Sequence, residues 1–221
     1  MVGWTVVEEK ASAGDLHNNP PDASRRLVRV CSVTGPALVL GSAQRVDDAA
    51  RRRAASLGFE VVARRSGGGA VLLAPGAQVW VDVTLPRGDA LWTDDVSRSG
   101  WWLGDAWAGA LESLGVVGAT VHKGPMVRSL LSGLVCFAGL GPGEVTVGAA
   151  KVMGVSQRRT RQGAVFQCTI PLSWDPSLLV EVLALGAADA AKVATAGLAL
   201  SDLIEPVTAE TITATLVTHL P

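Results

Sequence analysis

Short apolar runs bounded by turn-forming residues indicate strands in the first part of the chain. The clearest is VWVDVTL, where β-branched residues alternate as expected for a strand with two different faces. We expect strands at residues 27–31, 37–40, 59–64, 70–73 and 79–85. The β pattern returns after residue 120 and predicts further strands at residues 134–137, 145–147, 152–157 and 164–171.

Helical patterns separate and follow these strands. The Ala- and Arg-rich stretch 46–57 contains no Gly or Pro, and Gly58 follows it as a helix C-cap. Apolar residues recur near helical spacing in 94–114, the longest predicted helix, which Gly115 ends. Two more helices are predicted at roughly 176–185 and 209–219. The polar segment 11–25 contains two adjacent prolines and is predicted to be an exposed loop.

Clustered strands with helices between and after them predict an α+β fold, a mixed α/β sandwich. We expect a largely antiparallel or mixed sheet flanked by helices. The elements do not alternate regularly, which disfavours a doubly wound sheet. The length of 221 residues is enough for one sizeable core, so we expect a single domain over 1–221.

Composition narrows the class of protein. With 19 Lys+Arg, 20 Asp+Glu and a net charge of −1, the chain lacks the basic excess that nucleic acids or an anionic membrane surface would need. No apolar run reaches the ~18 residues of a membrane span, and the start does not resemble a secretory signal. Three cysteines, an odd number, favour reduced thiols and a cytoplasmic location. No CxxC or HxxxH spacing occurs, so we expect no metal site.

The first motif with candidate chemistry is RRSGGGAVLL at residues 64–73. Three glycines expose bare backbone N–H groups and permit positive φ. The loop leads into a strand instead of a helix and lacks GK[ST], which disfavours a dinucleotide or Walker site. A simple hairpin turn is the alternative. Arg64 and Arg65 favour a carboxylate or phosphate clamp.

The second motif is a lone lysine, Lys151, among small and apolar residues in GAAKVMGVSQ. Such a lysine can reach inward to a carbonyl or phosphate. The alternative is a side chain that points to solvent at a strand end, and spacing alone favours that alternative.

Together these motifs resemble the superfamily of lipoate–protein ligases, octanoyltransferases and biotin ligases. The resemblance covers roughly residues 37–174. Its three patterns are R-x-x-G-G-x-A-V at Arg64–Val71, G-x-x-Q at Gly41–Gln44, and K-[VI]-x-G-x-[SA]-Q-x-R at Lys151–Arg159. A further run, Cys136-Phe137 followed by Glu144 and Lys151, looks like the branch that keeps a ligase-type sequence but uses a cysteine thioester.

The chain departs from the family pattern at several places. Leu72 and Leu73 stand where a histidine commonly follows the glycine loop, and Gln167-Cys168 replaces the usual His-Gly. The Asn-Asp pair of adenylating ligases is not found before Lys151, nor is the P-C-G of the better-known octanoyltransferases. No accessory C-terminal domain is expected.

The resemblance implies transfer of an octanoyl or lipoyl group to a lysine of a carrier-domain protein. The acceptor would be a lipoyl domain or a glycine-cleavage H-type protein, and an acyl carrier protein is the possible donor. A transferase would require no cofactor, whereas a ligase would use ATP and Mg²⁺. A paralogue that binds an acyl ligand without turnover is the non-enzymatic alternative. Cys136 and the short chain favour the transferase.

Candidate site residues follow from the same resemblance. Lys151 would stabilise the developing oxyanion, and a thiolate is the plausible nucleophile. Cys136 is the preferred thiol and Cys168 the second, whereas Cys31 and the tryptophans of 101–107 are expected in the core. The expected substrate-binding residues are Arg64, Ser66, Gly67, Gly68, Gly69, Gly154 and Cys168.

Overall fold

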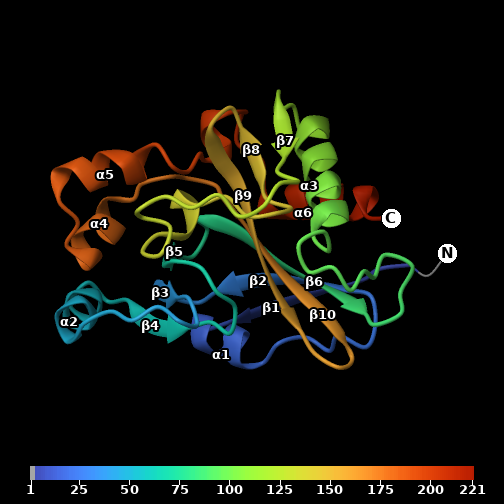
Figure 1. Cartoon of the computed structure of the whole chain (residues 1–221), viewed down its shortest axis with the longest axis horizontal. Helices are drawn as coiled ribbons and strands as arrows, with labels where there is room; N and C mark the ends of the chain where they lie inside the picture. The colour runs from blue at the N-terminus through green and yellow to red at the C-terminus, as the bar shows by residue number, and fades with distance from the viewer. Residues whose placement is uncertain (1–2) are drawn as a thin grey trace.

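Two sheets and six α-helices make up the computed structural model, which describes residues 3–221 (Figure 1). The large sheet has the strand order β1-β2-β6-β10-β9-β8-β7, and a small sheet has the order β4-β3-β5. The large-sheet strands are β1 (Thr5–Ala11), β2 (Leu27–Val33), β6 (Gln78–Pro86), β7 (Ala119–Val121), β8 (Val145–Val147), β9 (Ala150–Arg159) and β10 (Gly163–Pro171). The small sheet consists of β3 (Ala37–Leu40), β4 (Glu60–Ala63) and β5 (Val71–Leu73). Among the paired strands of residues 3–221, β1–β2 and β3–β4 are parallel and the others antiparallel, so the predicted mixed, largely antiparallel sheet is confirmed.

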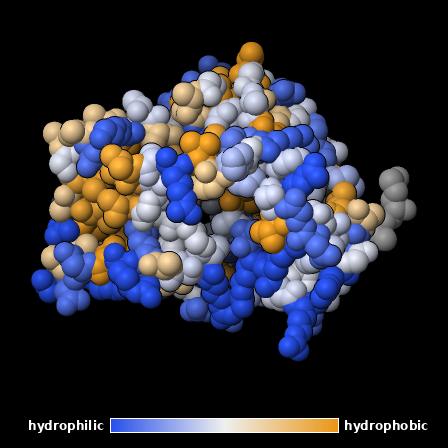
Figure 2. All heavy atoms as spheres, in the orientation of Figure 1, coloured by the Kyte–Doolittle hydropathy of each residue, from blue (hydrophilic) through white to orange (hydrophobic). Residues whose placement is uncertain are grey.

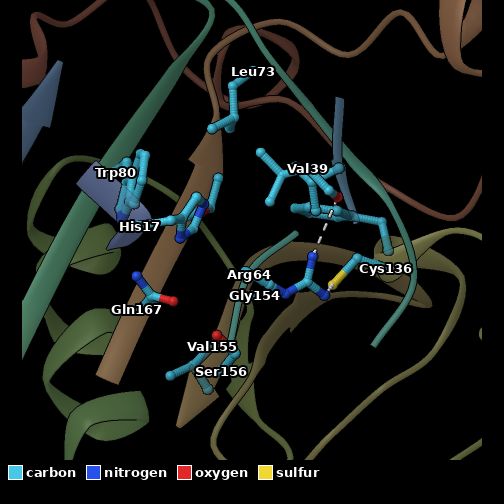
Figure 3. A pocket seen from close by; sticks show the side chains of 13 residues that line it. His17, Val39, Arg64, Leu73, Trp80, Cys136, Gly154, Val155, Ser156 and Gln167 are labelled. Carbon is cyan, nitrogen blue, oxygen red and sulfur yellow. Dashed lines mark hydrogen bonds between the residues drawn. The ribbon is translucent and has the colours of Figure 1, made fainter. Parts of the chain in front are cut away.

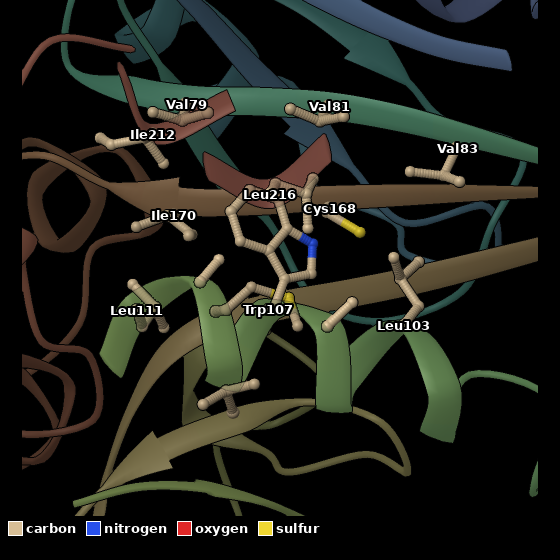
Figure 4. Close-up of a cluster of buried hydrophobic side chains, with 14 of the residues drawn as sticks. Val79, Val81, Val83, Leu103, Trp107, Leu111, Cys168, Ile170, Ile212 and Leu216 are labelled. Carbon is tan, nitrogen blue, oxygen red and sulfur yellow. The ribbon is translucent and has the colours of Figure 1, made fainter. Parts of the chain in front are cut away.

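Alternation along the central strands gives the large sheet two different faces. Val79, Val81 and Val83 of β6 point to one face, together with Phe166 and Ile170 of β10. Helices α3 (Trp101–Ser113) and α6 (Ala209–His219) cover this face and close the main core with Trp107 and Leu216 (Figures 1 and 4). Burying each such aliphatic side chain contributes about 1.5–3 kcal/mol, which makes this face the main source of stability.

The opposite face of the large sheet meets the small sheet. Trp80 and Cys31 of the large sheet pack there against Val39, Val62 and Leu73 of the small one. The short helix α1 (Ala13–Asn18) packs against the same cluster, and α2 (Asp48–Ser56), α4 (Ser177–Leu183) and α5 (Ala187–Ala194) lie at the far end. The space between the two sheets is where the candidate site lies.

Several element predictions were wrong. Residues 11–25 do not form an exposed loop, because they contain α1, with Leu16 and His17 buried. The helix predicted at 94–114 begins only at Trp101, since residues 94–99 are held in turns by hydrogen bonds such as that from Ser97 N to Asp95 Oδ1. The strand predicted at 134–137 is a 3₁₀ turn at Cys136–Ala138. The strands β1 and β7 and the helix α5 were not predicted.

The other predicted elements are confirmed to within two residues at either end. The capping signals explain part of this accuracy. Asp47 caps α2 by accepting a hydrogen bond from Ala50 N, and Gly58 follows the helix with φ +78°. None of the helices within residues 3–221 has the length and apolarity needed to cross a membrane.

Candidate active site

A cavity of about 50 Å³ lies between the two sheets (Figure 3). Four elements supply most of its wall: β5, β9, β10 and the turn at Cys136–Ala138. Its lining residues are His17, Val39, Arg64, Val71, Leu73, Trp80, Cys136, Phe137, Gly154, Val155, Ser156, Gln167 and Thr169. The wall is mostly apolar with a few polar groups, as is typical of ligand cavities.

Strand register explains which residues face the cavity. Thr169 of β10 pairs with Trp80 of β6 on one side and with Gly154 of β9 on the other. Two positions earlier on β10, Gln167 pairs with Ser156 of β9. Because side chains two apart share a face, these rows present Trp80, Gln167 and Thr169 to the cavity, and their neighbours turn toward the helices.

The glycine loop between β4 and β5 packs closely against its neighbours at two of its three glycines, Gly68 and Gly69. A Cβ on Gly69 would lie 2.5 Å from the backbone nitrogen of Val135, and one on Gly41 would overlap the carbonyl of Gly68. Gly68 itself has φ +99°, a conformation that L-residues with side chains rarely adopt. Ser66 is buried and donates to Ser156 Oγ of β9 at 2.9 Å, which ties the loop to the large sheet.

Arg64 lines the cavity, but its guanidinium is occupied by the protein. Nη2 donates to the carbonyls of Gly67 at 2.7 Å and Gly69 at 2.9 Å, while Nη1 lies 3.4 Å from Val39 O. The same Nη2 is 3.9 Å from Cys136 Sγ. The arginine therefore holds the glycine loop in shape, and the expected carboxylate or phosphate clamp has few donors left.

Cys136 is the half-buried thiol at the cavity wall. Its backbone nitrogen donates to Ala70 O at 3.0 Å, so the 3₁₀ turn is joined to the end of the glycine loop. Figure 3 shows Cys136 beside Arg64 on one side of the cavity, with His17, Trp80 and Gln167 on the other. The structure thus brings Arg64, Cys136 and Gly154 together around one space, whereas the predicted binding residues Ser66, Gly67, Gly68 and Gly69 are not among the residues that line it.

Lys151 is buried, with 3% of its surface exposed, so the solvent-pointing alternative is wrong. Its Nζ donates to Glu144 Oε2 at 2.9 Å and to the carbonyl oxygen of Cys136 at 2.8 Å. The ammonium also lies 5.2 Å from the centre of the Phe137 ring. Lys151 is not a lining residue of the cavity and instead supports the Cys136 turn from behind.

Cys168 does not reach the cavity, and its expected substrate contact is wrong. It lies on the helix-facing side of β10, fully buried, next to Trp107 in the main core (Figure 4). Burial raises the pKa of its thiol to about 12 and also raises that of Cys31. Cys31 lies in the core between the sheets, as predicted. Trp107 is core, and Trp102 is half-buried with its ring edge on Phe166.

Sequence reasoning missed His17, Trp80 and Gln167 as lining residues. His17 comes from α1, within the segment expected to be a loop. The signal that was available is Ser12 three residues before Asp15, a helix-start pattern in which Ser12 Oγ accepts from Asp15 N. Burial lowers the pKa of His17 from 6.5 to about 4, with Arg64 and Arg29 adding to the effect, so the ring is neutral at pH 7.

A second, larger space adjoins the cavity. This groove of about 210 Å³ shares Val71, Leu73, Phe137 and Thr169 with the cavity and continues past Trp174 toward α4. Figure 2 shows hydrophobic side chains gathered on the surface over α4. Within residues 3–221 no cluster of three or more His, Cys, Asp or Glu side chains could hold a metal ion.

Comparison with known proteins identifies the family to which the chain belongs. The family model described as the lipoyl protein ligase A/B catalytic domain matches residues 15–221. No curated protein matches the chain in sequence.

Several solved structures share the fold. A lipoate-protein ligase A bound with ATP gives a TM-score of 0.71 at 16% identity, covering 99% of this chain and 84% of that one. A T. acidophilum protein with bound lipoic acid gives 0.70 at 14% identity, over 99% and 84%. A bi-partite lipoate protein ligase from Thermoplasma acidophilum, described with its E2 lipoyl domain, gives 0.70 at 13% identity, over 99% and 82%.

Proposed function

The chain belongs to the lipoyl protein ligase A/B catalytic-domain family, and from that premise we propose that it transfers an octanoyl or lipoyl group to a carrier-domain lysine through a thioester on Cys136. The observation that carries the proposal is the placement of Cys136. Among the described residues it is the one cysteine whose side chain lines the cavity, whereas Cys31 and Cys168 are buried in the two cores.

The reaction would proceed in two balanced steps. The Cys136 thiol gives up its proton, its sulfur attacks the carbonyl carbon of an acyl thioester and forms a new thioester bond, and the donor sulfur leaves and takes up that proton. The ε-amine of the acceptor lysine then attacks the Cys136 thioester, forms an amide and returns the thiol. The amine loses one proton and the leaving sulfur gains one, so no redox partner is required.

Lys151 takes a different role in this mechanism from the expected oxyanion donor. Its ammonium holds the carbonyl of Cys136 and the carboxylate of Glu144. It therefore positions the nucleophile's backbone instead of facing the acyl group. We propose the amide of Gly68 for the oxyanion, because it donates to no other residue in the described part of the chain and a Cβ on Gly68 would lie 3.7 Å from Cys136 Sγ.

Charge pairing favours a donor that arrives already activated. A ligase would need cations to hold the phosphates of ATP. One structural neighbour, a lipoate-protein ligase A, is bound with ATP. Here the guanidinium of Arg64 is shared among backbone carbonyls and the ammonium of Lys151 is paired with Glu144. Neither buried cation beside the cavity is free for a phosphate, and we derive no step through ATP or Mg²⁺.

The partners proposed are protein domains. The acceptor would be a lipoyl domain or an H-type carrier protein, and the fold neighbour from T. acidophilum was described with its E2 lipoyl domain. An octanoyl acyl carrier protein would serve as the donor. Both would meet the chain from the side of the Cys136 turn.

Intact-mass measurement tests the proposal. The full chain is incubated with octanoyl acyl carrier protein, without ATP, and a hydroxylamine-labile octanoyl adduct is expected. The adduct should disappear in Cys136→Ser and persist in the matched control Cys168→Ser. An acyl-adenylate formed only with ATP and free octanoate would establish the ligase instead. Absence of any adduct or transferred product with all donors would favour the non-catalytic paralogue.

A further inference from the structure

Positive charge is concentrated in the segments around Cys136 and the glycine loop, although the chain as a whole has a net charge of −1. These segments are residues 41–46, 64–69, 123–140 and 154–161. Together they contain eight of the 19 Lys and Arg residues and none of the 20 Asp and Glu residues. The rest of the chain is therefore acidic, and the side of the molecule that carries the cavity is basic.

Two arginines lie beside the part of the cavity wall that Ser156 forms. Arg65 is exposed and precedes Ser66, whose Oγ donates to Ser156 Oγ at 2.9 Å. Arg158 follows Ser156 by two residues on β9, so it lies on the same face of the strand.

Two further arginines lie beside the segment that leads into Cys136. Arg45 is exposed in a turn whose Gln44 Nε2 donates to the carbonyl of Leu134 at 3.0 Å, and Arg128 is exposed eight residues before Cys136. None of the ion pairs found within residues 3–221 includes any of these four arginines. We call the four the basic rim: Arg45, Arg65, Arg128 and Arg158.

Exposed apolar side chains lie within the same surface. Residues 126–134 form an apolar segment in which four side chains are 38–93% exposed: Met126, Val127, Leu130 and Leu134. Its start is held by paired backbone hydrogen bonds between Val127 and Leu140, at 2.8 and 3.0 Å. An apolar centre with a polar edge is typical of protein interfaces, in which Met and Arg are enriched. The surface therefore suits a protein better than a free nucleotide.

We propose that the apolar segment and the basic rim dock the acyl donor, a carrier protein whose face beside its acyl arm is rich in carboxylates. The inference rests on the proposed function, because it assigns a surface to the donor that delivers the acyl group to Cys136. Opposite charges steer such a donor toward the cavity and orient it there. The acceptor fits less well, since its lysine brings a positive charge that the rim repels.

Binding of octanoyl acyl carrier protein to the Cys136→Ser chain tests the surface without turnover. In that background Arg65→Glu/Arg128→Glu should raise the Kd about tenfold or more. Arg51→Glu/Arg52→Glu is the matched control, because it makes the same change of charge at two exposed positions of α2, outside the rim. We expect this control to change the Kd less than about twofold.

Salt dependence and an uncharged substitution separate the two parts of the surface. Raising the salt from about 0.1 M to about 1 M shortens the Debye length from about 10 Å to about 3 Å and should weaken binding unless the rim is already reversed. Leu130→Ser should raise the Kd about tenfold without changing this salt dependence. Val117→Ser, at a position 86% exposed but outside the four segments, should leave the Kd unchanged.

A small neutral donor separates docking from chemistry at Cys136. With Cys136 present, octanoyl-N-acetylcysteamine should acylate Arg65→Glu/Arg128→Glu and the wild type at the same rate. Octanoyl acyl carrier protein below its Kd should acylate the double variant about tenfold more slowly. The salt dependence of binding to the otherwise unaltered Cys136→Ser chain tests the rim even where the charge-reversed chain does not fold.

Several results would overturn the inference: equal binding by the two arginine double variants, carrier binding that ignores salt, or an equal loss of reaction with the small donor. Weakened binding of a lipoyl domain or of ATP, with carrier binding unchanged, would assign the surface to the acceptor or to a nucleotide and would also overturn it. Charge-dependent carrier binding without any octanoyl adduct would refute the proposed function alone.

Discussion

Replacing Lys151 by Met should destabilise the fold as well as slow catalysis, because the ammonium is one half of a buried ion pair. The side chains of Lys151 and Glu144 are 3% and 6% exposed, and Nζ lies 2.9 Å from Oε2. The substitution keeps the length and much of the volume of the side chain while removing the charge. It therefore leaves the carboxylate buried without its counter-ion.

The magnitude follows from the remaining partners of Glu144. Removing one partner of a buried pair typically costs about 3–5 kcal/mol. Glu144 keeps the amides of Gly141 at 2.6 Å and Val155 at 3.3 Å, which places the expected cost near the lower end, about 3 kcal/mol. For a protein of this size that corresponds to a fall in Tm of about 6–12 °C.

Urea unfolding of four variants measures this cost. Lys151→Met and Glu144→Leu should each lose stability, and the double variant should lose much less than the sum, since it buries no unpaired charge. Lys192→Met is the control, because Lys192 and Asp189 form an exposed pair, 59% and 42% exposed, for which we expect less than about 1 kcal/mol. A Lys151→Met chain as stable as the wild type, yet inactive, would refute the supporting role and return the lysine to the acyl group.

Three further perturbations have defined outcomes. Iodoacetamide at pH 7 should alkylate Cys136 much faster than the two buried thiols, as read by peptide mass spectrometry; faster labelling of Cys168, whose pKa burial raises to about 12, would contradict the assigned burial. Gly68→Val should abolish acylation and lower the free energy of unfolding in urea by about 1–3 kcal/mol, because φ is +99° and a Cβ would lie 2.8 Å from Nη2 of Arg64. Gly67→Ala, which has open space around it, should change neither acylation nor stability. The pKa of His17 is lowered from 6.5 to about 4 on folding, so its contribution to the free energy of unfolding is complete above pH 6.5 and is lost as the pH falls toward 4, on the order of 3 kcal/mol in all. His17→Phe should flatten this part of the curve of stability against pH. An unchanged curve would show that other groups cause the loss of stability in acid.

Period-two alternation made the large sheet predictable. The pattern of residues 79–85 identified β6, and the alternation around Cys168 identified β10. That alternation also decides which face of β10 carries Cys168. Gln167 and Thr169 face the cavity, so Cys168 between them must face α3. The sequence shows that Cys168 and its neighbours Gln167 and Thr169 lie on opposite faces of β10. Which of the two faces lines the cavity depends on how the two sheets pack.

Local patterns failed where tertiary contacts determine the backbone. Residues 134–137 are apolar enough for a strand, but a single bridge between Ala70 and Val135 and the ammonium of Lys151 hold the segment as a turn. The polar residues around His17 looked like a loop because the helix there has only six residues and is stabilised from outside by Arg29. No residue near His17 in the sequence reveals that contact.

Two buried ion pairs support the cavity from opposite ends, and neither lies in its wall. Lys151 and Glu144 stand behind the Cys136 turn, while Arg29 and Asp82 stand behind the end that carries His17. The low dielectric of the interior makes such pairs rigid when they are fully hydrogen-bonded and costly when one partner is removed. A wall made of neutral groups and the carbonyl-paired Arg64 can then accept an uncharged chain without a further desolvation cost. Charge in this protein therefore fixes the geometry of the cavity, and the wall itself is left to apolar side chains, one thiol and one neutral imidazole.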